Sequence, residues 1–167
     1  INSANLLDKN HLWIDNSPAS PYEGYVYDAW TCFGGTNDGE IEFVRSTNGG
    51  VSWSSQTVIS AAISAGSHNQ GVNIQTGPDG EVYALWSVYD TWPADESALG
   101  MAKSTDGGAT FSPASQSAAS SVSIVYTFTA VPSIAYTLLL HWKISRGTRP
   151  HRYCAFSRSI TRPIFAG

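Results

Sequence analysis

Acidic, aromatic and amide side chains gather in three short segments of the sequence, residues 32–39, 60–71 and 88–98, and together they suit a sugar ligand. Aromatic rings can cover the apolar face of a pyranose while carboxylates bind its hydroxyl groups. The alternative is that these are ordinary surface loops, which are usually polar. The candidate ligand-binding residues in these three segments are Asp38, His68, Asn69, Asp90, Trp92, Asp95 and Glu96.

A second set of residues has types and spacing suited to building turns. The side chain of Asp or Asn can accept hydrogen bonds from amides of its own turn, and glycine tolerates a positive φ. We expect these residues to be structural, with the aromatic ring folded back into the gap between neighbouring units. Ligand or metal binding is the alternative. The two copies of the pattern are Ser46, Asn48, Gly50 and Trp53, and Ser104, Asp106, Gly108 and Phe111.

These turns belong to an internal repeat. Residues 24–31 return as 80–87, 56 residues later, and residues 46–53 return as 104–111, 58 residues later. The two matches keep the same order, and an insertion of two residues in the loop between them accounts for the change of offset. This self-similarity indicates two copies of one structural unit.

Each copy is expected to contain four short strands, because apolar and polar residues alternate with a period of two and no helical period persists. Four strands in a unit of about 40–60 residues are typical of a propeller blade. The sequence therefore predicts an all-β fold, an incomplete β-propeller of four-stranded antiparallel blades. The expected strands are 11–15, 25–31, 41–46 and 51–59, then 72–75, 81–87, 99–104 and 109–112.

The expected organisation follows the repeat. The first blade covers residues 1–60, the second covers 61–118, and 119–136 begin a third. Residues 137–167 form a basic tail of doubtful structure, which we do not expect to be an evolved part of the fold, because the blade pattern ends near Tyr136. Open blade edges invite pairing with another chain, so we expect the chain either to belong to a longer propeller of six or seven blades or to associate with copies of itself.

The two turn patterns resemble the Asp-box, or BNR repeat, of sialidase-like β-propellers. Residues 8–18 and 25–31 also resemble secreted bacterial members of that family. The resemblance implies a fragment of a glycoside hydrolase that acts on glycans, with an extracellular or periplasmic location. It also implies that the active site lies at the blade face that carries the three loop segments. Similar repeats serve unrelated functions, so the alternative is a non-catalytic propeller module that binds carbohydrate or protein.

The sialidase mechanism that this resemblance implies uses three arginines to clamp the substrate carboxylate, a tyrosine nucleophile activated by a glutamate, and an aspartate as acid and base. Within the two repeats the sequence contains one arginine, Arg45. Because Arg45 directly precedes a turn pattern, we expect it to pair locally on its own blade. The catalytic residues are therefore not assigned, and the chain is not expected to be catalytically complete.

Four further polar residues are assigned by their neighbours. Asp15 precedes Asn-Ser-Pro and is expected to cap that turn, with a position facing the propeller axis as the alternative. Asp28 lies in the middle of a strand and is expected on an exposed face. His11 and His68 have no partners at metal-ligand spacing, so neither a metal site nor a cofactor is expected.

Charge is distributed unevenly along the chain, although the net charge is only −4. All thirteen acidic residues precede residue 107, and six basic residues follow it. The overall balance gives no reason to expect a nucleic-acid partner, and five arginines in the tail are weak support for one. Residues 121–142 are uncharged, but their Ser, Thr, Pro and β-branched residues favour strands over a membrane span.

Overall fold

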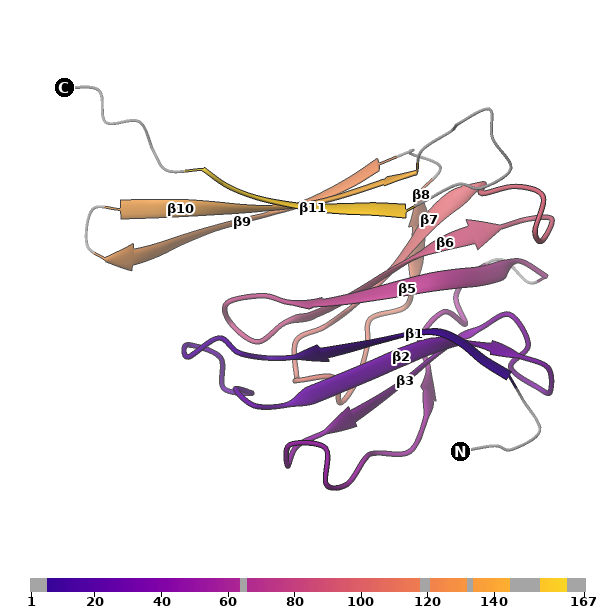
Figure 1. Cartoon of the computed structure of the whole chain (residues 1–167), viewed down its shortest axis with the longest axis horizontal. Coiled ribbons are helices and arrows are strands. Elements are labelled where there is room, and N and C mark those ends of the chain that lie inside the picture. The colour runs from indigo at the N-terminus through magenta and orange to yellow at the C-terminus, as the bar shows by residue number, and fades with distance from the viewer. Residues whose placement is uncertain (1–5, 64–65, 118–120, 132–133, 145–153, 162–167) are drawn as a thin grey trace. The chain divides into compact units, whose positions relative to one another are not determined.

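A computed structural model describes residues 6–63, 66–117, 121–131, 134–144 and 154–161, with side chains up to residue 117 (Figure 1). The chain divides into two units, Ile1–Ala118 and Ala119–Gly167. Each unit is described by itself. All the regular structure in the described residues is β-strand.

The first unit contains two four-stranded antiparallel sheets, each built from consecutive strands. The prediction of an all-β chain with four antiparallel strands in each repeat is therefore confirmed. Sheet 1 contains β1 (Leu6–Ile14), β2 (Val26–Phe33), β3 (Ile41–Ser46) and β4 (Thr57–Val58). Sheet 2 contains β5 (His68–Thr76), β6 (Val82–Tyr89), β7 (Ala98–Ser104) and β8 (Ser115–Ser117).

The fourth strand of each sheet begins later than expected. After the turn, the amide of Ser54 donates to the carbonyl of Arg45 at 2.9 Å, and its hydroxyl accepts from the amide of Arg45 at 3.1 Å. Ser112 makes the same two bonds with Lys103, at 2.8 and 3.3 Å. In each pair, one of the two backbone hydrogen bonds is replaced by a bond to the serine hydroxyl. Regular backbone pairing therefore starts only at β4 and β8.

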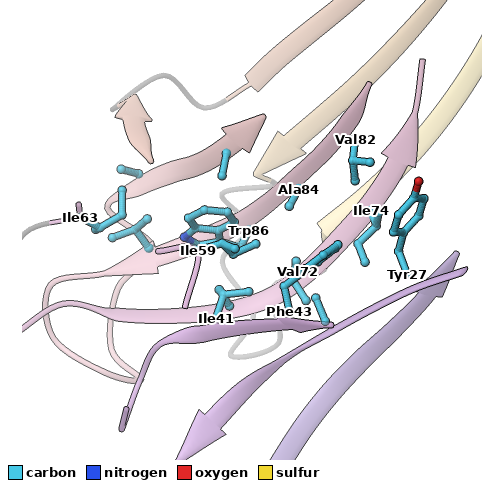
Figure 2. Close-up of a cluster of buried hydrophobic side chains, with 14 residues drawn as sticks. Tyr27, Ile41, Phe43, Ile59, Ile63, Val72, Ile74, Val82, Ala84 and Trp86 are labelled. Atoms are coloured by element: carbon cyan, nitrogen blue, oxygen red, sulfur yellow. The ribbon is translucent and has the colours of Figure 1, made fainter. Parts of the chain in front are cut away.

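The core lies between the two sheets, where alternate residues of their strands meet (Figure 2). Sheet 1 contributes Tyr27 and Phe43, and sheet 2 contributes Ile74 and Trp86. Gly100 lies beside Trp86 in the register of β6 and β7, and a Cβ atom there would lie 2.2 Å from Nε1 of that ring. The missing side chain of this glycine therefore makes room for the largest buried ring.

The first strands of the two sheets, β1 and β5, contact one another (Figure 1). The amide of Ile74 donates to Nδ1 of His11 at 3.2 Å, and the Trp13 indole donates to the Thr76 hydroxyl at 3.0 Å. Each strand has a bulge at the same place, between Asp8 and His11 in β1 and between Gln70 and Asn73 in β5. The two copies of the repeat therefore share even the bulge in their first strand.

The second unit is one antiparallel sheet of three strands, in the order β11-β10-β9. These are β9 (Ser121–Val131), β10 (Ile134–Ile144) and β11 (Cys154–Thr161). Strand β10 crosses the expected boundary at residue 136, and β11 lies in the range 137–167. None of the three described sheets is closed into a ring, so the propeller stays a prediction.

No helix in the described parts of the chain has the length and hydropathy needed to cross a membrane.

Candidate functional site

Four aromatic rings from the three predicted loop segments meet at one end of the two sheets. We call Phe33, His68, Tyr89 and Trp92 the aromatic cluster. The His68 ring lies 4.2 Å from that of Trp92 in a stacked arrangement and 4.8 Å from that of Phe33. The Tyr89 ring meets Trp92 edge-on at 4.8 Å. Trp92 remains 40% exposed, so the cluster presents one indole to solvent.

The loop after β6 holds Trp92 in place through its carboxylates. Oδ1 of Asp95 accepts a hydrogen bond from the amide of Thr91 at 2.9 Å, which closes the turn around Trp92. Oε1 of Glu96 accepts a hydrogen bond from the Tyr89 hydroxyl at 2.7 Å, and Glu96 is buried. Asp90 is exposed at the start of the loop. One carboxylate is thus presented to solvent, while the other two order the loop.

The other predicted residues hold the neighbouring loops. Oδ1 of Asp38 accepts from the amide of Gly34 at 2.7 Å and closes the loop after β2, where Asp38 itself is exposed. Asn69 is 1% exposed, and its side chain donates to the carbonyl of Gly39 at 3.0 Å and accepts from the Trp86 indole at 2.7 Å. Asn69 therefore joins the two sheets and does not face a ligand.

His68 is a stacking residue whose ring has a lowered pKa. Burial lowers its pKa, and the nearby Gln70 amide and Asp38 carboxylate oppose this shift. Nε2 of His68 is buried and has no hydrogen-bond partner among the described residues. A Cβ atom on Gly39 would lie 3.0 Å from Nδ1, so the glycine lets the loop approach the ring. The lowered pKa favours the uncharged form of the imidazole that stacks on Trp92.

A row of polar residues on the first strands was not identified from the sequence. The Gln70 side chain donates to Oδ2 of Asp8 at 2.6 Å, and the side chains of His11 and Asn73 lie 3.2 Å apart. Burial would raise the pKa of Asp8, but hydrogen bonds from Gln70 and Lys9 lower it. The sequence carries no signal for this row, because residues 8–14 and 70–76 share no residue type at matching positions, and only the strand registers place Asp8 and His11 in correspondence with Gln70 and Asn73.

The two turn patterns contain the same hydrogen bonds. In the first, the Ser46 hydroxyl accepts from the amide of Gly50 at 2.8 Å, and Oδ1 of Asn48 accepts from the amide of Ser52 at 2.9 Å. In the second, the Ser104 hydroxyl accepts from the amide of Gly108 at 2.9 Å, and Oδ1 of Asp106 accepts from the amide of Thr110 at 2.9 Å. These side chains are engaged within their own turns.

The aromatic residues of the two patterns lie in different surroundings. Phe111 packs on Phe43 with ring centroids 4.7 Å apart, so it fills the gap between the sheets as expected. Trp53 is 41% exposed, so the same prediction is wrong for the first copy. The reason is positional, because Phe111 packs against the core between sheets 1 and 2, whereas Trp53 lies outside that core.

Arg45 joins the two repeats. Its Nη1 donates to the carbonyl oxygens of Gly107 at 2.9 Å and of Asp106 at 3.3 Å. The expectation of a partner on its own blade is therefore wrong, because these acceptors belong to the turn of the second copy. Arg45 is the one arginine in the part of the chain with described side chains, and it lies away from the aromatic cluster. Those residues alone supply no arginine clamp.

Two aspartates in sheet 1 differ from one another. The prediction that Asp15 caps its turn is confirmed, because its carboxylate accepts from the amide of Ser17 at 3.1 Å and the hydroxyl of Ser20 at 2.6 Å. The prediction of an exposed Asp28 is wrong. Asp28 is half-buried, burial raises its pKa, and Oδ1 has no hydrogen-bond partner among the described residues. Its partners in register on the two neighbouring strands, Leu12 and Val44, are both apolar.

The described residues contain no group of three or more His, Cys, Asp or Glu side chains arranged to hold a metal ion. The loops around the aromatic cluster can bind a ring-shaped ligand in two ways. The ligand can stack on Trp92, and its hydroxyl groups can donate hydrogen bonds to the exposed carboxylates of Asp38 and Asp90. No protein-family model matches the chain, and no curated protein matches it either.

Proposed function

We propose that the loop end of the two sheets binds carbohydrate and that the chain is part of a sialidase-like BNR-repeat propeller. The observation that carries the proposal is the exposed indole of Trp92, which packs on His68 and Tyr89 and lies in the same loop as the exposed Asp90. An indole fixed by packing loses little conformational entropy when a sugar stacks on it. The extracellular or periplasmic location follows from the same resemblance.

Hydrolysis is the second candidate function, and one observation favours it. The hydrogen bond of 2.7 Å between the Tyr89 hydroxyl and Glu96 pairs the residue types that serve a sialidase as nucleophile and activating base. One observation argues against catalysis by this chain: the one arginine with a described side chain, Arg45, donates to the carbonyl oxygen of Gly107 in the second turn. Catalysis would therefore require arginines from elsewhere, whereas sugar binding needs only the cluster as it stands.

The test compares two tryptophans of nearly equal exposure at different places in the chain. Binding of sialyllactose and of lactose is measured by saturation-transfer NMR and by titration of the wild type, Trp92→Ala and Trp53→Ala. We expect Trp92→Ala to weaken binding about tenfold, because one stacking contact contributes about 1.5 kcal/mol. Trp53→Ala should leave the affinity unchanged, since Trp53 follows a turn pattern and does not belong to the aromatic cluster.

The results separate the candidates. Equal weakening by both substitutions, or no binding of either sugar, would contradict the carbohydrate proposal. Release of sialic acid by the wild type, abolished in Tyr89→Phe while binding persists, would favour the hydrolase. Binding without turnover would favour the non-catalytic module.

A further inference from the structure

The three loop segments that form the aromatic cluster carry negative charge without positive charge. Residues 32–39, 60–71 and 88–98 contain four acidic residues and neither lysine nor arginine. Two of the four, Asp38 and Asp90, are exposed. A ligand that stacks on Trp92 therefore approaches a surface of negative potential.

Asp38 has a fixed place beside two rings of the cluster. Its Oδ1 accepts from the amide of Gly34 at 2.7 Å, and Gly34 directly follows Phe33. The next residue after Asp38 is Gly39, which approaches His68 so closely that a Cβ atom would lie 3.0 Å from Nδ1. The charge of Asp38 also acts on this ring, because it opposes the lowering of the pKa of His68. The carboxylate thus lies at the cluster while Asp38 remains exposed.

The basic side chains that the structure describes are paired or lie at the other end of the sheets. Lys9 on β1 forms an ion pair with Asp8, in which Nζ lies 3.3 Å from Oδ2. Arg45 and Lys103 lie on β3 and β7 at the end of the sheets that carries the turn patterns. From there β2 and β6 run about six residues, or about 20 Å, to the aromatic cluster. Among these described side chains, an anionic ligand at Trp92 would find no free cation.

The exposed indole favours the same sign of ligand charge. His68 is stacked on Trp92, and the indole is still 40% exposed. The face of an aromatic ring attracts a cation, and indole does so more strongly than the other aromatic side chains. A sugar ring that carries an amine is positively charged when that amine is protonated. Such a ring can combine stacking with attraction to the indole and to the carboxylates.

We propose that the aromatic cluster binds an amino sugar, with its amine protonated, in preference to a neutral or an anionic sugar. This inference rests on the proposed function, which supplies the sugar ring as the ligand. The ring stacks on Trp92, and the ammonium group faces the carboxylate of Asp38. Asp90, exposed in the same loop as Trp92, adds to the negative potential. A sialic acid is disfavoured at the cluster, because its carboxylate would join these charges without a counterion.

Four sugars test the proposal by titration of the full chain at about pH 6, where an amine of this kind is protonated. They are the methyl glycosides of glucosamine, N-acetylglucosamine, glucose and sialic acid. The glucosamine glycoside differs from the glucose glycoside by one ammonium group, and it should bind about tenfold more tightly. Acetylation removes the charge and should remove this preference. The sialic acid glycoside should bind more weakly than the glucose glycoside.

Asp38→Asn measures the share of the carboxylate. Asparagine retains an oxygen for the amide of Gly34, so the loop should stay closed. The preference for the glucosamine glycoside should fall from about tenfold to about threefold, while the affinity for the glucose glycoside stays the same. Asp79→Asn is the matched control and should change neither affinity. Asp79 is an exposed aspartate in the turn between β5 and β6, at the other end of the sheets.

Salt dependence tests the role of charge without a substitution. Sodium chloride at about 0.5 M should reduce the preference for the glucosamine glycoside and leave the affinity for the glucose glycoside unchanged, because salt screens exposed charges. Circular dichroism checks that each variant remains folded, and the salt series gives an answer even if Asp38→Asn does not fold.

The possible results separate this inference from the proposed function. Equal affinity for the glucosamine and glucose glycosides would overturn the inference. So would tighter binding of the sialic acid glycoside, or a preference that neither salt nor a folded Asp38→Asn reduces. Binding of the glucose glycoside that Trp92→Ala weakens, without any preference for the amine, would refute the inference alone. No binding of any of the four sugars would contradict the proposed function as well.

Discussion

Replacing Asp106 tests whether the turn patterns stabilise the fold through their own hydrogen bonds. The Asp106 carboxylate accepts from the amide of Thr110 at 2.9 Å, from its hydroxyl at 2.6 Å, and from the hydroxyl of Ser104 at 2.8 Å. Burial would raise the pKa of Asp106, but these bonds outweigh it and lower the pKa to about 2. The charged form is therefore preferred in the folded chain.

The magnitude follows from this shift. Lowering a pKa from 3.8 to about 2 corresponds to about 2.4 kcal/mol if the full shift acts on stability. Because Asp106 lies near solvent, we take about 1 kcal/mol. Since the folded pKa lies below the unfolded one, this stabilisation is complete above about pH 4 and is lost as the pH falls from 4 to 2. Asp106→Ala should thus lower the unfolding free energy at pH 7 by about 1 kcal/mol.

The first copy provides the control. Oδ1 of Asn48 accepts the corresponding hydrogen bond from the amide of Ser52, and Asn has no titratable group. Asp106→Asn should therefore keep the turn and lose only the part of the stability that depends on pH. Urea unfolding at pH 7, 4 and 2.5, followed by tryptophan fluorescence, measures this, since five of the six tryptophans precede residue 118. The reasoning is refuted if Asp106→Asn and the wild type lose stability equally between pH 4 and 2.5, or if Asp106→Ala is neutral at pH 7.

Two further predictions concern the contact between the sheets. Gly100→Ala should lower the unfolding free energy by about 3 kcal/mol, because its Cβ atom would lie 2.2 Å from Nε1 of Trp86. In urea unfolding, the penalty should shrink when Trp86→Leu is added, and an equal penalty in both backgrounds would count against a steric cause. Burial lowers the pKa of His11, whose Nδ1 accepts from the amide of Ile74, so stability present above about pH 6.5 should fall as the folded chain is acidified below it. His11→Asn should reduce the difference in urea midpoint between pH 7.5 and 5.5, and an unchanged difference would contradict this cause.

The strands and turns could be predicted because each depends on residues close in sequence. The alternation around Tyr27 and Tyr83 marks β2 and β6, and the turn at Asp106 is closed by bonds to residues within four positions. The starts of β4 and β8 were placed too early, because Ser54 and Ser112 complete the pairing with a hydroxyl group. Sequence alternation does not reveal that exchange.

The candidate site depended in part on contacts between distant segments. The three loop segments were expected at one end of the sheets, and the stacking of His68 on Trp92 joins two of these segments. The burial of Asn69 was missed, because its partners Gly39 and Trp86 come from other strands and loops. Arg45 was misassigned for the same reason, since its acceptors at Asp106 and Gly107 lie 61 and 62 residues away.

The sequence by itself determined the strand type, the repeat and the hydrogen-bonded turns, because side-chain alternation, glycine conformation and Asp or Asn capping act over a few residues. Only the tertiary structure decided which copy of a repeated residue is covered. Phe111 and Trp53 occupy the same position in the pattern, yet one packs on Phe43 and the other faces solvent. The physical reason is that burial depends on the neighbouring sheet, and two equal repeats placed head to tail have unequal neighbours.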